Sequence, residues 1–259
     1  MKVLGIDPAP AKKSLVFDGR EFYSFDVTTL INYLESEKER DSLFISWDAP
    51  LSAAIDKKNF SLTIRKIERF FNRSGRYAKR LEIPEGISTL GYSGCPHWTI
   101  SQYIFGLPIL NPSLQISPDY KLLMSNDRLD FSISYITEIH PALSMWILLK
   151  EKLADNPLFK NSWKYKGDSS SDTKRRRAIL IESILSLELT QEYLLKKISI
   201  ESDDALDSFV CWLLGTAFVA KDKRVKVYGD DKNGSFLLPL DKEIEGSLEN
   251  YLISKGSER

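Results

Sequence analysis

The run Asp203-Asp204-Ala205-Leu206-Asp207-Ser208-Phe209-Val210-Cys211-Trp212-Leu213-Leu214-Gly215 predicts a buried helix with carboxylates at its start. Beyond Asp207 the run is almost entirely apolar, so the body of this helix must lie in the core. Asp204 and Asp207 are three residues apart and share one helical face, whereas Asp203 lies off that face and is expected to cap the helix. Buried carboxylates are costly unless a cation or a hydrogen-bond donor meets them. We therefore expect such a partner beside Asp204 and Asp207.

The composition shows no dominant charge. The 259 residues include 36 Lys and Arg against 36 Asp and Glu, so net charge indicates no partner. A chain of this length can bury a substantial core. Its two cysteines, Cys95 and Cys211, provide neither a disulfide framework nor a metal knuckle. The chain opens on a predicted strand without a signal-peptide pattern, and no apolar run approaches the roughly 20 residues of a membrane span. We expect a cytoplasmic protein.

The first fifty residues predict a strand, a hairpin, a helix and another strand. Apolar runs at residues 3–7 and 43–47 indicate buried strands. Asp18-Gly19 is a strong turn signal between strands at 14–17 and 22–25, and apolar residues at helical spacing follow Asp26, a plausible cap. The strand at 43–47 should run parallel to the first.

The rest of the chain predicts an α/β protein that forms a single domain over residues 1–259. Residues 55–80 are mostly helical and basic in pattern, and residues 84–130 are irregular, with a short helix near 98–105, which indicates a lid-like insertion. Later elements are expected as a strand at 133–139, a helix reaching 149, a polar linker at 164–173, helices at 175–187 and 203–220, and a hairpin at 223–228 and 235–238. Residues 222–255 then form a C-terminal hairpin and helix extension.

Acidic residues recur at the ends of the predicted elements. Asp7, Asp48 and Glu138 end strands, and Asp204 with Asp207 opens the last core helix. The carboxyl ends of parallel strands form the crevice in which open sheets place their chemistry. Converging carboxylates raise one another's proton affinity, a problem that Mg²⁺ or Mn²⁺ removes. Two such ions about 3.5–4 Å apart could activate water and stabilise an in-line phosphoryl displacement.

Each acidic residue also has a structural interpretation. An Asp at a strand end often caps a helix or forms a turn, which suits Asp48 before Ala49-Pro50. Glu138 could be a paired surface residue. The coincidence of all these positions at element ends favours the metal site.

Five short motifs resemble the signatures of the domain of unknown function 429 family: Gly5-Ile6-Asp7, Trp47-Asp48-Ala49-Pro50-Leu51, Thr137-Glu138-Ile139-His140-Pro141, Asp204-Ala205-Leu206-Asp207-Ser208 and Gly234-Ser235-Phe236-Leu237-Leu238-Pro239. That family is placed in the ribonuclease H-like superfamily, beside the Holliday-junction resolvases. The resemblance spans nearly the whole chain, although residues 84–130 match none of its motifs. It implies a five-stranded mixed sheet in the order 3-2-1-4-5, with strand 2 antiparallel. It also implies catalytic and metal-ligand roles for Asp7, Asp48, Glu138 and Asp204 or Asp207.

Basic residues indicate a surface for a nucleic-acid substrate. Between Lys57 and Arg80 there are nine Lys or Arg residues opposed only by Glu68. A phosphate-tracking face interleaved with aromatic residues would use side chains at helical spacing, namely Arg65, Arg69, Arg73 and Arg76 or Arg80. The alternative is a solvated amphipathic helix. By resemblance to the family's basic helix start, Arg177 is a further phosphate contact.

The two histidines differ in promise. Cys95-Pro96-His97 lacks further Cys or His ligands at zinc-binding spacing, and no residue is identified that would orient a Cys–His nucleophile. His140 follows Glu138 closely and is expected to orient water or contact a phosphate, or else to have a structural role.

The sequence therefore predicts a metal-dependent nuclease that hydrolyses phosphodiester bonds in nucleic acid with water. Kinases and ATPases of the actin-like fold also begin with a strand-end Asp, but the glycine-rich phosphate loops that they need are missing here. A module that binds nucleic acid or protein without catalysis remains the other alternative, because fold alone does not decide activity.

Overall fold

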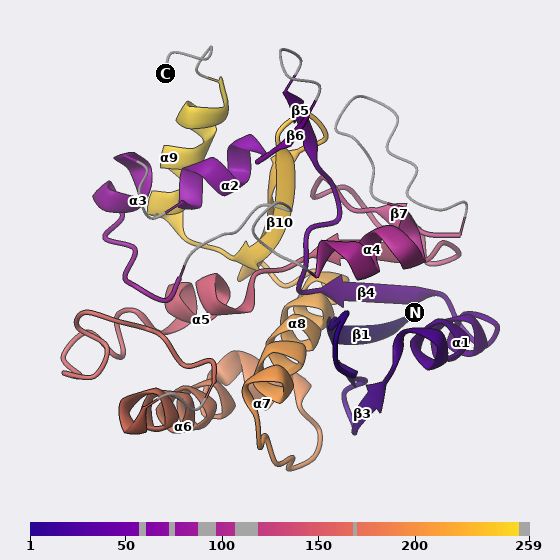
Figure 1. Ribbon diagram of the computed structural model, residues 1–259, viewed down its shortest axis with the longest axis horizontal. Helices are drawn as coiled ribbons and strands as arrows, with labels where there is room; N and C mark the ends of the chain where they lie inside the picture. The colour runs from indigo at the N-terminus through magenta and orange to yellow at the C-terminus, as the bar shows by residue number, and fades with distance from the viewer. Residues whose placement is uncertain (57–60, 73–75, 88–96, 107–118, 168–169, 254–259) are drawn as a thin grey trace.

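A central mixed sheet flanked by helices organises the protein (Figure 1). The computed structural model describes residues 1–56, 61–72, 76–87, 97–106, 119–167 and 170–253. The sheet has six strands in the spatial order β3-β2-β1-β4-β8-β7. Their bounds are Phe22–Phe25 (β3), Ser14–Phe17 (β2), Lys2–Asp7 (β1), Leu43–Trp47 (β4), Tyr135–Glu138 (β8) and Lys121–Leu122 (β7).

Five of the six strands run in one direction. β1 pairs in parallel with β4, β4 with β8, and β7 with β8, whereas β2 is antiparallel to both of its neighbours. The expected antiparallel second strand and the order 3-2-1-4 are confirmed. The expected count of five strands is wrong, because among the described residues β7 adds a sixth strand beyond β8. β7 has only two residues, too few to show an apolar alternation in the sequence.

Helices cover both faces of the sheet. All five residues of β4 are buried, as a strand covered on both sides requires. Their side chains alternate between two cores: Phe44 joins the core formed with α8, and Ile45 joins the core formed with α1 and α4. The helices of these layers are α1 (Val27–Lys38), α4 (Trp98–Phe105), α5 (Pro141–Leu149), α6 (Ser171–Leu185), α7 (Glu188–Tyr193) and α8 (Asp203–Val219).

Capping residues set the starts of several helices. Asp26 accepts the Thr29 N–H at the start of α1, as expected. Ser202, rather than Asp203, caps α8 by accepting the Ala205 N–H at 3.1 Å. Ser170 caps α6, which therefore begins four residues before the predicted position 175. The expected linker is shortened accordingly.

The basic segment is not one long helix. It forms a small hairpin of β5 (Ala54–Asp56) and β6 (Ser61–Thr63), followed by two short helices, α2 (Lys66–Phe71) and α3 (Arg76–Arg80). The predicted helical face is therefore wrong as a continuous surface. Buried residues explain the break, because Phe70 and Phe71 are fully buried and pin α2 into the core.

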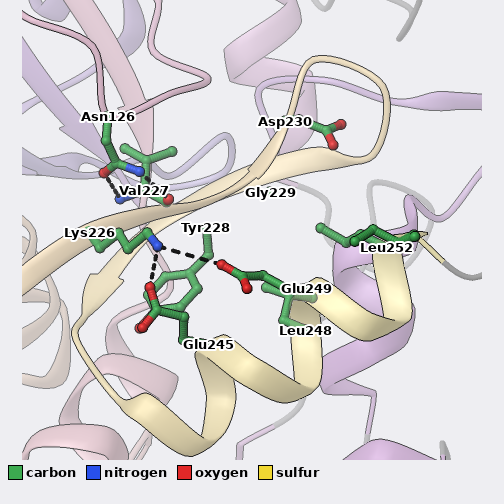
Figure 2. A pocket seen from close by; sticks show the side chains of 11 residues that line it. Asn126, Lys226, Val227, Tyr228, Gly229, Asp230, Glu245, Leu248, Glu249 and Leu252 are labelled. Atoms are coloured by element: carbon green, nitrogen blue, oxygen red, sulfur yellow. Dashed lines mark hydrogen bonds and ion pairs between the residues drawn. The ribbon is translucent and has the colours of Figure 1, made fainter.

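The C-terminal hairpin and helix form as predicted, with β9 (Val225–Asp230), β10 (Gly234–Pro239) and α9 (Lys242–Ile253). In Figure 1, α9 lies beside α2, and Tyr251 contacts both Phe70 and Tyr77. Figure 2 shows how Asn126 covers part of β9: its side-chain amide accepts the Val227 N–H at 2.7 Å and donates to the Val227 carbonyl at 2.9 Å. Within the part of the chain that is described, no helix is long and apolar enough to cross a membrane.

Candidate metal centre

Three carboxylates converge at one edge of the sheet. Asp7 is the last residue of β1, Asp48 follows β4, and Asp207 lies in the first turns of α8. One oxygen from each lies within 4.8 Å of the others. The parallel pairing of β1 and β4 brings the first two together, since Ile6 stands beside Trp47 and the Asp48 N–H donates to the Ile6 carbonyl at 3.0 Å. We refer to these residues as the acidic triad.

Two glycines allow α8 to lie directly on the sheet. A Cβ atom on Gly5 would lie 2.1 Å from the Ser208 carbonyl oxygen and 2.2 Å from the Trp212 nitrogen. A Cβ on Gly215 would lie 2.1 Å from the Ser46 hydroxyl. Only glycine permits so close an approach. This contact carries Asp207, at the start of the helix, to the end of β1, where Asp7 lies.

The triad is buried and electrostatically unfavourable. Asp7 is 7% exposed and Asp207 is fully buried. Burial raises the pKa of Asp7 well above its usual value, and the charges of Asp48 and Asp207 raise it further. Burial raises the pKa of Asp48 to about 8, against the opposing effect of Lys166. Burial also raises the pKa of Asp207. Charged together, these groups require a compensating cation.

Asp7 has no such partner of its own. Among the residues that the structure describes, none donates a hydrogen bond to the Asp7 carboxylate or forms an ion pair with it, and one of its oxygens lies within 4.8 Å of oxygens of Asp48 and Asp207. Opposite oxygens around an octahedral Mg²⁺ are about 4.2 Å apart. One oxygen from each triad residue lies within 4.8 Å of the others, so the three are near enough to share one ion. An all-oxygen set of this kind suits a hard divalent cation.

Lys166, in the segment predicted as a polar linker, supplies one positive charge beside the triad. The Lys166 ammonium lies 2.6 Å from the Asp207 Oδ2 and 3.6 Å from the Asp48 Oδ2. Burial disfavours the ammonium, but the negative charges of Asp207 and Asp48 outweigh it and raise the pKa of Lys166. The Tyr165 hydroxyl donates a hydrogen bond to the Asp207 Oδ1. Both oxygens of Asp207 are thus engaged.

The loop that carries Lys166 is held by Asp203. The Gly167 N–H donates to the Asp203 Oδ2 at 2.8 Å, and Gly167 has a positive φ of 77°. Arg177 lies 3.6 Å from the Asp203 Oδ1, and its guanidinium donates to the Gly167 carbonyl at 3.4 Å. The structure thus places Arg177, expected at a phosphate, behind this loop. No pattern near Lys166 in the sequence indicates these contacts.

Asp204 lies outside the triad. It forms an ion pair with Lys12, from the loop between β1 and β2, and its charge raises the pKa of Asp7. Its side chain is 30% exposed, so this pair lies toward solvent while Asp207 faces inward. The shared helical face of Asp204 and Asp207 is real, but the two residues have different partners.

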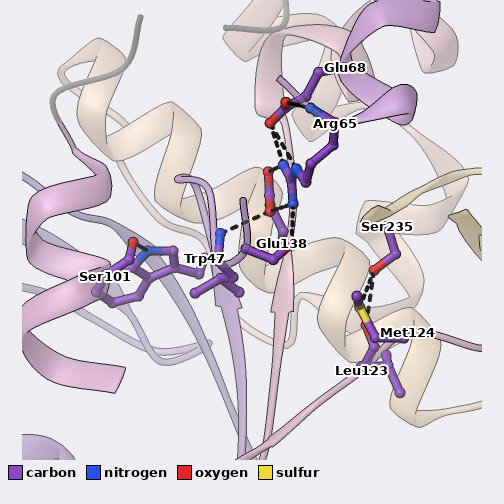
Figure 3. Close-up of polar contacts among 10 residues, drawn as sticks. Trp47, Arg65, Glu68, Ser101, Leu123, Met124, Glu138 and Ser235 are labelled. Atoms are coloured by element: carbon purple, nitrogen blue, oxygen red, sulfur yellow. Dashed lines mark hydrogen bonds and ion pairs between the residues drawn. The ribbon is translucent and has the colours of Figure 1, made fainter. Parts of the chain in front are cut away.

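Arg65 binds the Glu138 carboxylate (Figure 3), and Glu138 is not one of the three clustered carboxylates. Arg65 is 1% exposed and donates to the Glu138 Oε2 at 2.7 Å and to the Glu68 Oε1 at 2.9 Å. The Leu51 N–H also donates to Glu138, at 3.0 Å. In this structure Glu138, expected as a metal ligand, and Arg65, expected at a phosphate, form an ion pair with each other in the core. Arg65 appeared solvated in the sequence because α2 was taken as part of one long basic helix.

The other described arginines of the basic segment lie on two separate short helices. Arg69 is exposed on α2 and donates to the Thr63 hydroxyl at 3.3 Å, while Arg76 is exposed on α3. Arg73 lies outside the described residues. The break between α2 and α3 removes the helical spacing that suggested a common surface.

His140 has a structural role in this fold, whereas His97 lies near the acidic triad. The His140 Nδ1 accepts the Leu143 N–H at 3.2 Å and so caps α5, a structural role. His97, at the start of α4, lies close enough to the centre for Lys166, Lys12 and Asp204 to act on it electrostatically. Burial lowers the pKa of His97, and the two lysines lower it further. Cys95 lies outside the described residues.

The fold and this centre define a mixed α/β protein with a candidate metal site. Residues 119–233 match the family described as "Protein of unknown function (DUF429)", which confirms the resemblance to the domain of unknown function 429 family over that part of the chain. The matched residues include Glu138, the Lys166 loop and the start of α8. Neither the curated proteins nor the solved structures contain a match to the chain.

Proposed function

We propose that this protein is a divalent-metal-dependent nuclease that hydrolyses phosphodiester bonds in nucleic acid. The observation that carries the proposal is the convergence of Asp7, Asp48 and Asp207, with triad oxygens within 4.8 Å of one another and Asp7 buried beside them. Such a cluster of oxygen ligands suits Mg²⁺ or Mn²⁺ better than a softer metal.

The arrangement of the sheet supports a ribonuclease H-like relationship. Its strands begin in the order 3-2-1-4, β2 alone is antiparallel, and the triad lies at the ends of β1 and β4. These are the features that the resemblance implies for the fold and its metal-binding edge. β7, at the far edge of the sheet, does not disturb the strands that hold the triad.

The residues around the triad suit phosphodiester chemistry. Asp7, Asp48 and Asp207 would hold the cation, which when bound activates water and stabilises charge on the phosphoryl group. Tyr165 and Lys166 fix the orientation of Asp207. Lys166 and Lys12 place ammonium groups beside the carboxylates, where a phosphodiester would need positive charge.

The test is cleavage of defined nucleic acids. Purified protein is incubated with single-stranded, duplex, hybrid and branched substrates in the presence of Mg²⁺ or Mn²⁺, beside Asp7→Asn and Asp207→Asn. Asp155→Asn is the matched control, because Asp155 is an exposed aspartate that is not part of the triad. We expect cleavage by the wild type and the control, and a loss of at least about 100-fold in both triad variants.

Two outcomes would refute the proposal: no cleavage of any substrate, or cleavage that is unchanged in both triad variants. Nucleic-acid binding that persists without cleavage would instead favour a binding module on the same fold.

A further inference from the structure

We propose that Lys166 takes the place of a second divalent ion, so that the acidic triad holds one ion and not two. This inference rests on the proposed metal-dependent function and replaces the two ions expected from the sequence. Its basis is the position of the Lys166 ammonium, 2.6 Å from Asp207 and 3.6 Å from Asp48.

The ammonium bridges two residues of the triad in the way that a second ion would. In two-metal centres a carboxylate commonly lies between ions about 3.5–4 Å apart. Here the Asp207 Oδ2 faces Lys166 and the Oδ1 accepts the Tyr165 hydroxyl. Asp7 is the triad residue for which the described part of the chain provides neither a hydrogen-bond donor nor an ion-pair partner, so its carboxylate is open to a divalent ion.

Lys166 is held in this position by the main chain. The next residue, Gly167, adopts a positive φ and donates its N–H to Asp203, and the preceding residue, Tyr165, is fully anchored through Asp207 and is 2% exposed. The lysine is therefore fixed on both sides, although its own side chain is 52% exposed. A surface lysine that met Asp207 by chance would lack these supports.

The charges balance with one ion and not with two. The three ionised carboxylates carry three negative charges, which one divalent ion and the Lys166 ammonium neutralise together. Asp204 is balanced separately by Lys12. A second divalent ion would leave an excess of two positive charges beside Lys166, and like charges at such short range repel strongly in a buried site.

The experiment counts bound Mn²⁺ in the full chain by calorimetry and by electron paramagnetic resonance. The variant is Lys166→Met, which keeps the length of the side chain and removes its charge. Lys164→Met is the matched control, because Lys164 is exposed and lies two residues away in the same loop. We expect one Mn²⁺ in the wild type and in the control, and two in Lys166→Met.

Two ions in the wild type would overturn the inference and leave the metal-dependent function standing. One ion in folded Lys166→Met would overturn it as well. No bound Mn²⁺ in the wild type would overturn the inference together with the proposed function. The wild-type count needs no variant, so the test survives if Lys166→Met does not fold.

Discussion

Asp203 accepts the Gly167 N–H at 2.8 Å, so the first residue of α8 holds the loop from which Lys166 reaches Asp207 in the same helix. One helix start thus supplies both a triad carboxylate and the anchor for its partner. Asp203 would have been assigned to helix capping on the sequence alone, yet Ser202 performs that task.

Removal of this anchor should cost measurable stability. Asp203→Ala removes the acceptor of the Gly167 N–H and the ion-pair partner of Arg177. Hydrogen bonds to charged groups contribute about 1.5–3 kcal/mol. Because Asp203 is partly exposed, we expect the lower end of that range in urea unfolding. Asp155→Ala should change stability by less than about 0.5 kcal/mol, and an equal effect of both variants would contradict the anchoring role.

The metal-free protein should lose stability as pH rises from about 4 to about 8. In the folded protein the pKa of Asp48 is raised to about 8, and the pKa values of Asp7 and Asp207 are raised as well. In the unfolded chain an Asp has a pKa of about 4. Within this pH window the folded state therefore keeps protons that the unfolded chain has released. The folded state then binds more protons, so the free energy of unfolding falls with pH.

Saturating Mg²⁺ should flatten this decline, because the ion stabilises the ionised carboxylates. The measurement is urea unfolding between pH 4.5 and 8.5, in EDTA and in Mg²⁺. Carboxyls with lowered pKa values, such as Asp26 and Asp222, stabilise the folded state while they are ionised. They lose this stabilising contribution only below about pH 4, so they do not affect the slope between about pH 4.5 and 8.5. A metal-free stability that is level or rises with pH would contradict the expectation.

Asp7→Asn should stabilise the protein without metal and abolish its response to metal. The amide removes one of three repelling charges at a buried position that has no partner among the described residues. We expect a gain on the order of 1 kcal/mol at pH 8, or about 2–4 °C in melting temperature for a chain of this size. The check is a thermal melt with EDTA and with Mn²⁺, in which the wild type alone should shift with Mn²⁺. A destabilised metal-free variant would argue that Asp7 has a structural partner.

Arg65→Met should be among the most damaging substitutions in the chain. It leaves Glu68 and Glu138 buried without their cation, a change that typically costs about 3–5 kcal/mol. Arg69→Met, exposed on the same helix, should cost less than about 0.5 kcal/mol in urea unfolding.

The same network allows a rescue. When Arg65→Met is combined with Glu68→Gln and Glu138→Gln, the uncompensated charges are gone, and a large part of the lost stability should return. If the triple variant is no more stable than Arg65→Met, charge is not what Arg65 contributes at this position.

Gly5→Ala should destabilise the protein by at least about 3 kcal/mol. The added Cβ would collide with the main chain of α8 at Ser208 and Trp212, and neither atom belongs to a flexible side chain. Gly246 in α9 offers the opposite case, since a Cβ there meets nothing within 4 Å and alanine favours a helix by about 1 kcal/mol. Thermal melts of both variants should therefore move in opposite directions.

Local patterns predicted the strands that hold the triad. Apolar runs at residues 3–7 and 43–47, a turn at Asp18-Gly19 and an apolar helix after Asp207 were sufficient to place Asp7, Asp48 and Asp207 at one edge of the sheet. These signals are short-range and periodic, so they can be followed along a single chain.

The features that the sequence did not predict depend on contacts between residues far apart in the chain. Lys166 and Asp207 are 41 positions apart, and nothing around Lys166 distinguishes it from a solvated linker residue. Arg65 and Glu138 are 73 positions apart, and a basic run conceals that one of its members is buried. β7 is recognised only through its pairing with β8. Such pairings are decided by tertiary packing and leave no local period.

The close contact between β1 and α8 determines which substitutions the geometry of the centre tolerates. Gly5 meets α8 main chain to main chain, so the separation of Asp7 and Asp207 follows from backbone contact and not from the sizes of packed side chains. Cores accept many apolar exchanges of similar volume, and such exchanges should accumulate here without moving the carboxylates apart. The geometry of the centre is instead vulnerable to a single added methyl group at Gly5 or Gly215.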